Sequence, residues 1–220
     1  MASDLDHAAL MDRVYRLQRR FGFYDATRKY YLLGRDPMIE GLRPPPGGTV
    51  LEIGCGTGRN LIKAARRYPD AGFHGVDISR EMLAASASAV ARAGMAKRIR
   101  LAWADAESFD PLATFRQEGY DRVFISYAVS MIPRWQAVMR DAVRYLAPGG
   151  ELHVVDFGDM AGLPRWSRHA MRTWLRWYHV TPRPDLIEVA GAIAAEIGGE
   201  SEAERMHRGF SWICVVRKRR

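Results

Sequence analysis

Short apolar runs alternate with helix-length segments along most of the chain, and this alternation is the feature that most constrains the fold. The runs that fit buried strands are residues 49–53, 72–76, 99–103, 122–127 and 152–155. Helical patterns lie between them, around residues 58–68, 80–94, 108–117 and 133–146. Strict alternation of strand and helix predicts a mostly parallel sheet with right-handed crossovers and helices on both faces, which is a doubly wound α/β fold.

The two ends of the chain depart from this alternation. The Pro-Pro-Pro-Gly-Gly run at 44–48 separates a helical preamble from the α/β part. We therefore expect residues 1–45 to form an N-terminal helical lid or membrane-contact segment, and residues 46–220 to form one domain. Near the other end, helical patterns at 163–178 and 185–197 precede two strands, 201–207 and 210–216, joined by Arg208-Gly209. A closing hairpin on a parallel sheet implies one antiparallel strand near an edge.

Composition excludes several classes of protein. With 220 residues, 48% of them hydrophobic and 26% charged, the chain has the composition of a folded soluble domain. No run of about 18 uncharged apolar residues and no secretory signal occur, so we expect a protein that neither spans a membrane nor is exported by that route. The two cysteines form no metal-ligand pattern, which favours a reducing cytosol, small packing roles for both and no metal site.

A glycine-rich loop follows the first predicted strand directly. It reads Glu52-Ile53-Gly54-Cys55-Gly56-Thr57-Gly58-Arg59-Asn60 and opens a helix. Glycines let the backbone approach a ligand closely at the carboxyl end of a strand, where open α/β sheets bind ligands. Asp77 ends the next strand, where a carboxylate can accept both hydroxyls of a ribose. Asp105, just past the third strand, is placed to accept from an adenine amino group, with the Ala106 amide beside the ring.

The spacing of this loop, G-x-G-x-G with Glu52 before it, differs from the dinucleotide pattern G-x-G-x-x-G. It resembles motif I of class I S-adenosylmethionine-dependent methyltransferases, and Asp77, Asp105 and residues 123–127 match that family's following motifs. Residues 146–152 resemble the family's entry to its fifth strand. The resemblance covers about residues 48–158 and implies a Rossmann-like sheet of seven strands, mostly parallel with one antiparallel strand. It makes residues 46–220 a class I methyltransferase domain.

The resemblance also implies S-adenosylmethionine as the cofactor, S-adenosylhomocysteine as its product, and no metal. Gly54 and Gly56 would flank the methionine part of the cofactor, and Glu52 would organise the loop. Asp77 would hold the ribose, and Ile78 would pack against the adenine. The complete set of expected cofactor-binding residues is Tyr24, Glu52, Gly54, Gly56, Gly58, Asn60, Asp77, Ile78, Ser79, Asp105, Ala106 and Ser126.

The cofactor motifs do not indicate which molecule accepts the methyl group. The net charge of +8 suits nucleic acid, an anionic membrane or an acidic substrate, so charge alone does not choose among them. The Pro-Pro-aromatic motif of DNA amino-methyltransferases is absent at residues 125–128, where the sequence reads Ile-Ser-Tyr-Ala. Nucleic acid is therefore a disfavoured partner. The basic tail at 217–220 still leaves an RNA-binding or RNA-modifying protein of the same fold as an alternative.

Two segments have the pattern of helices that contact a membrane surface. Leu10, Val14, Leu17 and Phe21 recur at helical spacing among arginines. In 163–178, aromatic residues share one face and arginines another: Trp166, Ala170, Trp174 and Trp177 against Arg168, Arg172 and Arg176. A lid over the cofactor pocket and ordinary packing against the sheet are the alternatives. Together the segments favour a cytoplasmic protein peripherally associated with the inner face of the cell membrane, with an anionic surface and an amine-bearing lipid as partners.

A second resemblance concerns the acceptor. Residues 24–36, 124–127, 130–133 and 153–158 resemble the methyltransferase of bacterial betaine-lipid synthesis. That resemblance implies successive methylation of the amine of diacylglycerylhomoserine to the trimethyl lipid. Bacterial phosphatidylethanolamine N-methyltransferase shares the fold, the cofactor and the membrane association, and it stays an alternative. The sequence leaves the oligomeric state open.

An amine acceptor needs a desolvated, aromatic site, because the amine must be neutral to react and its product becomes a permanent cation. We expect Tyr127 to line the acceptor amine, Ser126 to contribute an oxygen, and Asp156 to orient the ammonium or pass its proton to solvent. Tyr24 and Tyr30 would close the site from the lid. The residues expected to hold a substrate carboxylate or phosphate are Arg28, Lys29 and Arg35. His74 and His153 are interpreted as packed core residues.

Overall fold

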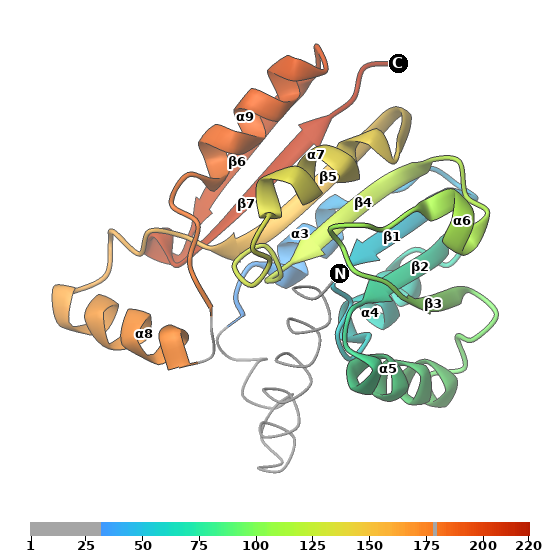
Figure 1. The fold of residues 1–220 in the computed structure, drawn as a ribbon, viewed down its shortest axis with the longest axis horizontal. Helices are drawn as coiled ribbons and strands as arrows, with labels where there is room; N and C mark the ends of the chain where they lie inside the picture. Colours follow the sequence, from blue (N-terminus) through green and yellow to red (C-terminus); the bar gives the residue numbers. More distant parts are fainter. Residues whose placement is uncertain (1–31, 178–179) are drawn as a thin grey trace.

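The computed structural model describes residues 32–177 and 180–220 and places them around one seven-stranded sheet (Figure 1). The strands are β1 (Thr49–Ile53), β2 (Gly72–Asp77), β3 (Ile99–Trp103), β4 (Tyr120–Ser126), β5 (Leu146–Phe157), β6 (Glu200–Met206) and β7 (Ser211–Arg217). Their order is β3-β2-β1-β4-β5-β7-β6. All neighbours run parallel from β3 to β5, whereas β7 is antiparallel to both β5 and β6. The predicted fold class is confirmed.

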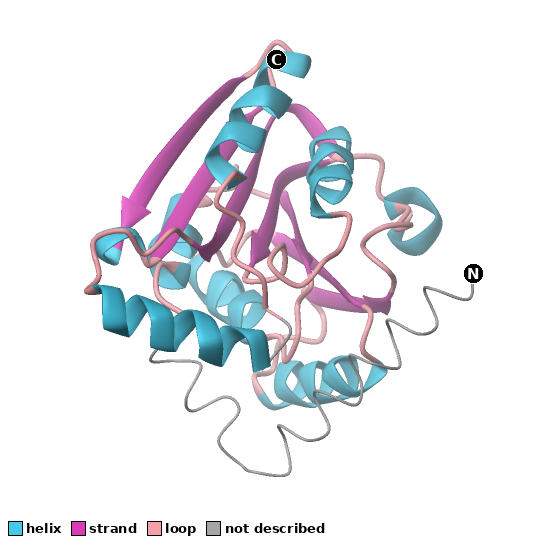
Figure 2. Cartoon of the chain, turned by 60° about the vertical axis from the view of Figure 1, so that its left-hand side comes forward, coloured by secondary structure: helices cyan, strands magenta, loops and turns pink. Residues whose placement is uncertain are grey.

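Helices cover both faces of the sheet (Figure 2). They are α3 (Arg35–Gly41), α4 (Arg59–Arg67), α5 (Arg80–Arg92), α6 (Pro111–Phe115), α7 (Trp135–Arg144), α8 (Arg165–Trp177) and α9 (Leu186–Glu196), with a short 3-10 turn at His207–Gly209. One apolar core joins the sheet to α6, α7 and α9. A second core joins the opposite face to α3, α4 and part of α5. Burial on both faces explains why the central strands read as continuous apolar runs rather than as alternating ones.

Two elements differ from their predicted bounds. The helix expected at 108–117 is only α6, because Asp110 caps it by accepting from the amides of Leu112 and Ala113, and Arg116 ends it with a left-handed φ of 58°. Strand β5 begins at Leu146, six residues before the predicted start. Residues 147–150 contain one proline and two glycines, a composition that predicts a turn. In the structure they belong to β5, because the pairing of β4 with β5 shifts its register between Tyr120 and Arg122.

The register of the sheet brings the predicted site to one edge. Ile53 at the end of β1 pairs with Val76 of β2 on one side and with Ile125 of β4 on the other. Ser126, the next residue of β4, pairs with Val155 of β5. The loops that follow these four strands therefore leave the sheet side by side. The connections diverge between β1 and β4, and such a switch point is where open α/β sheets bind ligands.

Candidate cofactor and acceptor site

One pocket lies at this edge of the sheet, and its empty volume, open mouth included, is about 1060 Å³. A nucleoside-sized ligand and an acceptor group fit a pocket of this size. Of the predicted site residues, those that line it are Arg35, Gly54, Gly56, Asn60, Asp77, Ile78, Asp105, Ala106, Ser126 and Tyr127. The structure thus brings together residues from α3 to the end of β4 that are widely separated in the sequence.

The glycine loop forms one wall of the pocket. Gly54, Gly56 and Gly58 have left-handed φ angles of 74°, 51° and 75°, which side chains other than glycine rarely adopt. A Cβ atom at Gly54 would lie 2.8 Å from the Cβ of Ala128, and one at Gly58 would overlap the Oγ of Ser86. A Cβ atom at Gly56 would meet nothing within 4 Å. Gly54 and Gly58 therefore pack the loop, whereas Gly56 borders the open space that a cofactor would fill.

Asp77 connects the glycine loop to the next loop. Its Oδ2 accepts from the Gly56 amide at 2.7 Å, and its Oδ1 accepts from the Ser79 amide at 2.9 Å. Ser79 is fully buried and absent from the pocket lining, and it caps α5, its Oγ accepting from the Met82 amide. The predicted ribose contact is compatible with this arrangement, because Asp77 lines the pocket while it orders the loop.

Glu52 supports the pocket from beneath. Its side chain is fully buried, and Asn60 donates to Glu52 Oε1 at 2.8 Å. Burial raises the pKa of Glu52 to about 8, and the hydrogen bond from Asn60 opposes this rise. At neutral pH the group is therefore mostly uncharged. Glu52 fixes the position of Asn60, which lines the pocket, and it does not itself border the cavity.

The end of the pocket expected to hold adenine is built from the loops after β2 and β3. Trp103 donates from Nε1 to the Ile78 carbonyl at 2.7 Å, and the guanidinium of Arg80 lies 4.5 Å from the Trp103 ring centre. Asp105 Oδ1 accepts from the Glu107 amide at 2.9 Å, which turns the chain at the pocket edge. These contacts hold Ile78 and Asp105 at the pocket wall, where the expected apolar and polar contacts with an adenine ring are both available.

The acceptor end is formed by the end of β4 and by α3. Tyr127 has a left-handed φ of 55°, donates from its hydroxyl to the Leu33 carbonyl, and packs its ring 4.7 Å from that of Phe157. Burial raises its pKa above the ordinary value, so the phenol stays neutral and serves as an aromatic wall. The buried Ser126 hydroxyl has no hydrogen-bond partner within the described residues. Arg35 is only 6% exposed, and it also lines the pocket.

Asp156 lies under the acceptor loop, residues 128–133, and is absent from the pocket lining. It is fully buried, and its two oxygens accept from the amides of Ser130 at 3.0 Å and Phe157 at 2.7 Å. Burial raises its pKa to about 6. Instead of the direct contact with an ammonium that the sequence suggested, this geometry makes Asp156 a positioning residue for the loop.

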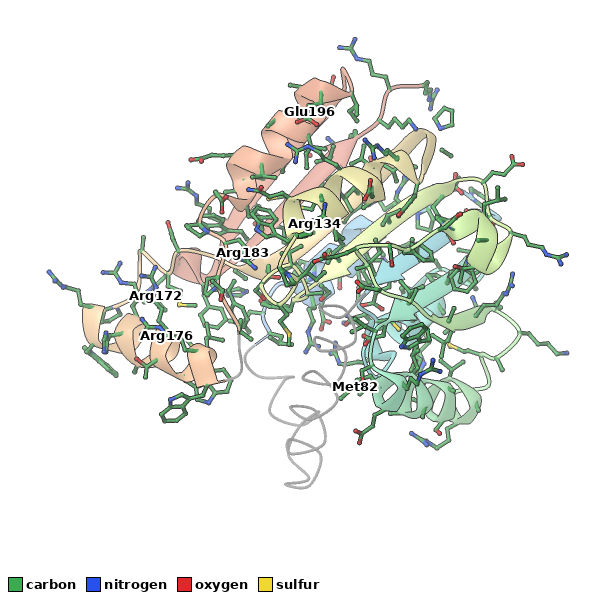
Figure 3. All side chains as sticks on the ribbon, viewed as in Figure 1. Met82, Arg134, Arg172, Arg176, Arg183 and Glu196 are labelled. Carbon is green, nitrogen blue, oxygen red and sulfur yellow. The ribbon has the colours of Figure 1, made fainter. Side chains whose placement is uncertain are left out.

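Arg183, labelled in Figure 3, also contacts the acceptor loop. It donates from Nε to the Val129 carbonyl at 3.2 Å and from Nη2 to the Ile132 carbonyl at 2.9 Å. Sequence reasoning assigned no role to Arg183, because nothing local marks a contact that spans more than 50 residues. The acceptor loop itself had a signal, namely its position after β4 at the switch point.

The remaining predicted residues fall into two groups. Tyr24, Arg28, Lys29 and Tyr30 lie outside the described residues and stay predictions, as does the N-terminal lid. The two histidines are packed core residues, as expected. His74 stacks on Phe115 and shares a 2.8 Å hydrogen bond with the Tyr120 hydroxyl, and burial lowers its pKa to about 4. His153 is buried beside Glu151.

Comparison with known proteins agrees with this geometry. Residues 50–150 match the family model described as "Methyltransferase domain". The ubiquinone/menaquinone biosynthesis C-methyltransferase UbiE of Syntrophotalea carbinolica is 32% identical over 176 residues, which are 76% of this chain and 70% of the relative. The chain belongs to the class I S-adenosylmethionine-dependent methyltransferases, and S-adenosylmethionine is its cofactor.

Other relatives differ in the atom that they methylate. A phosphatidylethanolamine N-methyltransferase of Cereibacter sphaeroides is 34% identical over 110 residues, half of this chain and 51% of the relative. The phosphoethanolamine N-methyltransferase 2 of Haemonchus contortus, solved with S-adenosylmethionine, shares the fold with a TM-score of 0.66 at 20% identity, covering 84% of this chain and 52% of that one. The chain spans about half the length of several of the curated relatives that it matches.

Proposed function

We propose that this protein transfers methyl groups from S-adenosylmethionine to the amine of a membrane-lipid head group, in successive methylations of diacylglycerylhomoserine to its trimethyl betaine lipid. The observation that carries the proposal is the composition of the acceptor end of the pocket. The aromatic ring of Tyr127 and the buried Arg35 share this end with the Ser126 hydroxyl, which has no hydrogen-bond partner among residues 32–177 and 180–220. An aromatic ring, an oxygen and a cation together fit a molecule that carries both an amine and an acidic group.

The bound cofactor supplies a methyl group activated on a sulfonium, so the protein has to align the acceptor and exclude water. Leu32, Met131 and Ile132 make this part of the wall apolar. Such surroundings disfavour an ammonium and so favour the neutral amine that can react. The Ser126 hydroxyl is available to accept from the amine N–H, and the Tyr127 ring attracts the cation that forms. Each transfer would leave S-adenosylhomocysteine and an ammonium, whose proton would pass to solvent through the open mouth of the pocket before the next methylation.

The acidic group of the acceptor would meet Arg35. Diacylglycerylhomoserine carries a carboxylate near its amine, and a guanidinium binds a carboxylate through charge-assisted hydrogen bonds. Arg35 also donates from Nε to the Leu32 carbonyl at 3.1 Å, which fixes the position of its guanidinium. A phosphate would serve the same guanidinium, which makes phosphatidylethanolamine the second candidate acceptor. The similarity to the phosphatidylethanolamine N-methyltransferase of Cereibacter sphaeroides supports this second candidate.

The basic end of the chain gives little support to the RNA alternative. Arg217 lies in β7 and forms ion pairs with Glu151 at 2.9 Å and Glu202 at 2.7 Å. Lys218 donates from Nζ to the Leu146 carbonyl at 2.8 Å. Half of the four-residue basic tail is therefore engaged by the sheet, which leaves a small charge for binding a phosphate backbone.

Methyl transfer to dispersed lipids tests the proposal directly. Purified protein and labelled S-adenosylmethionine are incubated with detergent-dispersed diacylglycerylhomoserine, phosphatidylethanolamine or phosphatidylcholine, and the label is counted in the organic phase. We expect transfer to the homoserine lipid and none to phosphatidylcholine, whose nitrogen is already quaternary. Faster transfer to phosphatidylethanolamine would select the second candidate. No label in either amine lipid, with the cofactor bound, would contradict a lipid-amine acceptor.

Arg183→Gln is expected to weaken acceptor binding selectively. The variant loses two hydrogen bonds to the acceptor loop. The loss of about 1.4 kcal/mol of support for this wall of the site should raise the KM for the lipid by about tenfold. The Kd of the cofactor should stay within about twofold of the original, since Arg183 does not line the cofactor end. Kinetics at varied lipid concentration and calorimetric titration with the cofactor measure the two quantities.

Arg140→Gln is the matched control for this variant. Arg140 makes an exposed ion pair with Glu196 and does not reach the acceptor loop. An equal increase of the lipid KM in the Arg140 and Arg183 variants would show that the effect of the Arg183 substitution is not specific to the loop. A cofactor Kd that rises as much as the lipid KM in the Arg183 variant would reject the positioning role of Arg183.

A further inference from the structure

Helix α8 lies at the edge of the molecule, apart from the layers that the other helices form (Figure 1). Leu175 is its only residue that is fully buried. Trp166 and Trp177 are 76% and 75% exposed, which makes them the most exposed large hydrophobic side chains of the described residues. The two positions are eleven residues apart, or about three helical turns, so both side chains lie on the same face of α8. The sequence also allowed ordinary packing of this helix against the sheet. That interpretation is wrong for Trp166 and Trp177, because both side chains are exposed.

The charge of α8 is entirely positive. Its arginines are Arg165, Arg168, Arg172 and Arg176, and it contains no acidic residue. Arg172 donates from Nη2 to the Asp159 carbonyl at 3.1 Å. Arg172 and Arg176 lie one helical turn apart on α8 (Figure 3). In the part of the chain that the structure describes, no carboxylate forms an ion pair with these arginines. A surface with unpaired arginines beside exposed tryptophans therefore faces solvent.

From this surface we infer that α8 is an interfacial helix that docks the protein on an anionic lipid bilayer, an inference that rests on the proposed lipid acceptor. Tryptophan is favoured at the head-group level because its ring is apolar and its N–H is polar. Arginines flanking it add attraction to anionic lipids. Among the helices of the described residues, none is long and apolar enough to cross a bilayer. An in-plane helix of this composition supplies the contact that such a protein needs to reach a lipid head group.

The chain after α8 connects the docking surface to the acceptor loop. The Val180 amide donates to the Leu175 carbonyl at 3.1 Å, and the Thr181 amide donates to the Ser130 carbonyl at 2.9 Å. Arg183 continues this connection through its two hydrogen bonds to the same loop. A bilayer in contact with α8 would therefore lie close to the acceptor end of the pocket, which is the end that a lipid amine has to enter.

The test compares vesicle binding of the full chain with that of the double variant Trp166→Ala/Trp177→Ala. Both side chains are exposed, so the melting temperature should not change. We expect sedimentation with vesicles of equal parts phosphatidylcholine and phosphatidylglycerol to weaken by about tenfold or more, because two interfacial anchors are lost. Leu112→Ala, which removes an exposed apolar residue of α6, is the matched control and should bind as before. Unchanged binding of the double variant would overturn the inference.

A second pair of variants tests the charge. Arg165→Gln/Arg176→Gln removes two charges from α8, and Arg66→Gln/Arg67→Gln removes two exposed charges from α4. Docking through α8 predicts a much larger loss of vesicle binding, and a larger reduction of its salt dependence, for the first pair. Equal losses for both pairs would overturn the inference. Loss of RNA binding by the α8 variants with vesicle binding intact would also overturn it, in favour of a nucleic-acid surface.

This result is separable from the methylation assay. A tryptophan variant that no longer sediments with vesicles but still methylates detergent-dispersed lipid would support docking through α8 and the proposed function together. A wild-type protein that binds vesicles through α8 but methylates neither amine lipid would leave the docking role in place and refute the proposed function alone.

Discussion

Asp77→Ala is expected to weaken binding of S-adenosylmethionine by about 100-fold or more. The carboxylate holds the Gly56 and Ser79 amides and lines the pocket, so its removal disorders the glycine loop and removes the expected ribose contact. Hydrogen bonds to a charged group contribute about 1.5–3 kcal/mol each, and the loss of about 2.8 kcal/mol corresponds to 100-fold in affinity. Isothermal titration with the cofactor measures this change.

Two further variants make the experiment with Asp77 specific. Asp77→Asn keeps one acceptor oxygen of similar shape, and its affinity should lie between those of the original protein and the alanine variant. Asp70→Ala removes an exposed carboxylate from the turn after α4 and should bind the cofactor normally. A cofactor Kd within threefold of the original for Asp77→Ala would mean that the cofactor does not occupy this pocket.

Glu52→Gln should abolish a large pH dependence of stability. The pKa of Glu52 is raised to about 8 from an ordinary value of 4.5, because the group is buried. Between these two values the folded state holds a proton that the unfolded state releases, so the free energy of unfolding falls as pH rises from about 4.5 to about 8. The stabilisation is complete below pH 4.5, and the total loss is on the order of 5 kcal/mol.

The glutamine variant mimics the neutral acid and keeps an oxygen that accepts from Asn60. Urea unfolding at several pH values should show a free energy of unfolding that is flatter between pH 6 and pH 8 and higher at pH 8 than in the original protein. Asp156, whose pKa is raised to about 6, retains its own decline below that range in both proteins. The exposed Glu118→Gln is the control and should keep the original slope. An original protein that is more stable at pH 8 than at pH 6 would contradict the burial of a neutral Glu52.

Local sequence patterns were sufficient to predict which residues line the end of the pocket expected to hold the cofactor. The glycine loop follows a strand directly, and Asp77 and Asp105 follow the next two strands, so strand–loop spacing places all of them at one edge of a parallel sheet. The start of β5 was missed because Pro148, Gly149 and Gly150 have the composition of a turn. Their inclusion in a strand depends on the irregular pairing with β4, which no local pattern reports.

Long-range contacts explain what the sequence left open at the acceptor end. Strand position brings Asp156 to the correct edge, but its burial beneath the loop depends on Ser130, which lies 26 residues away. The amphipathic pattern of α8 fits a core helix and an interfacial helix equally well. Only the observed exposure of Trp166 and Trp177 separates the two interpretations.

The most direct test of the proposed function is the position of the transferred methyl group. Protein, S-adenosylmethionine carrying a trideuterated methyl group, and vesicles containing diacylglycerylhomoserine and phosphatidylethanolamine are incubated, and the extracted lipids are fragmented by mass spectrometry. We expect head-group fragments of the homoserine lipid that carry one, two and three labelled methyl groups on nitrogen. Label found only on carbon or oxygen, or only in molecules without an amine, would contradict the account.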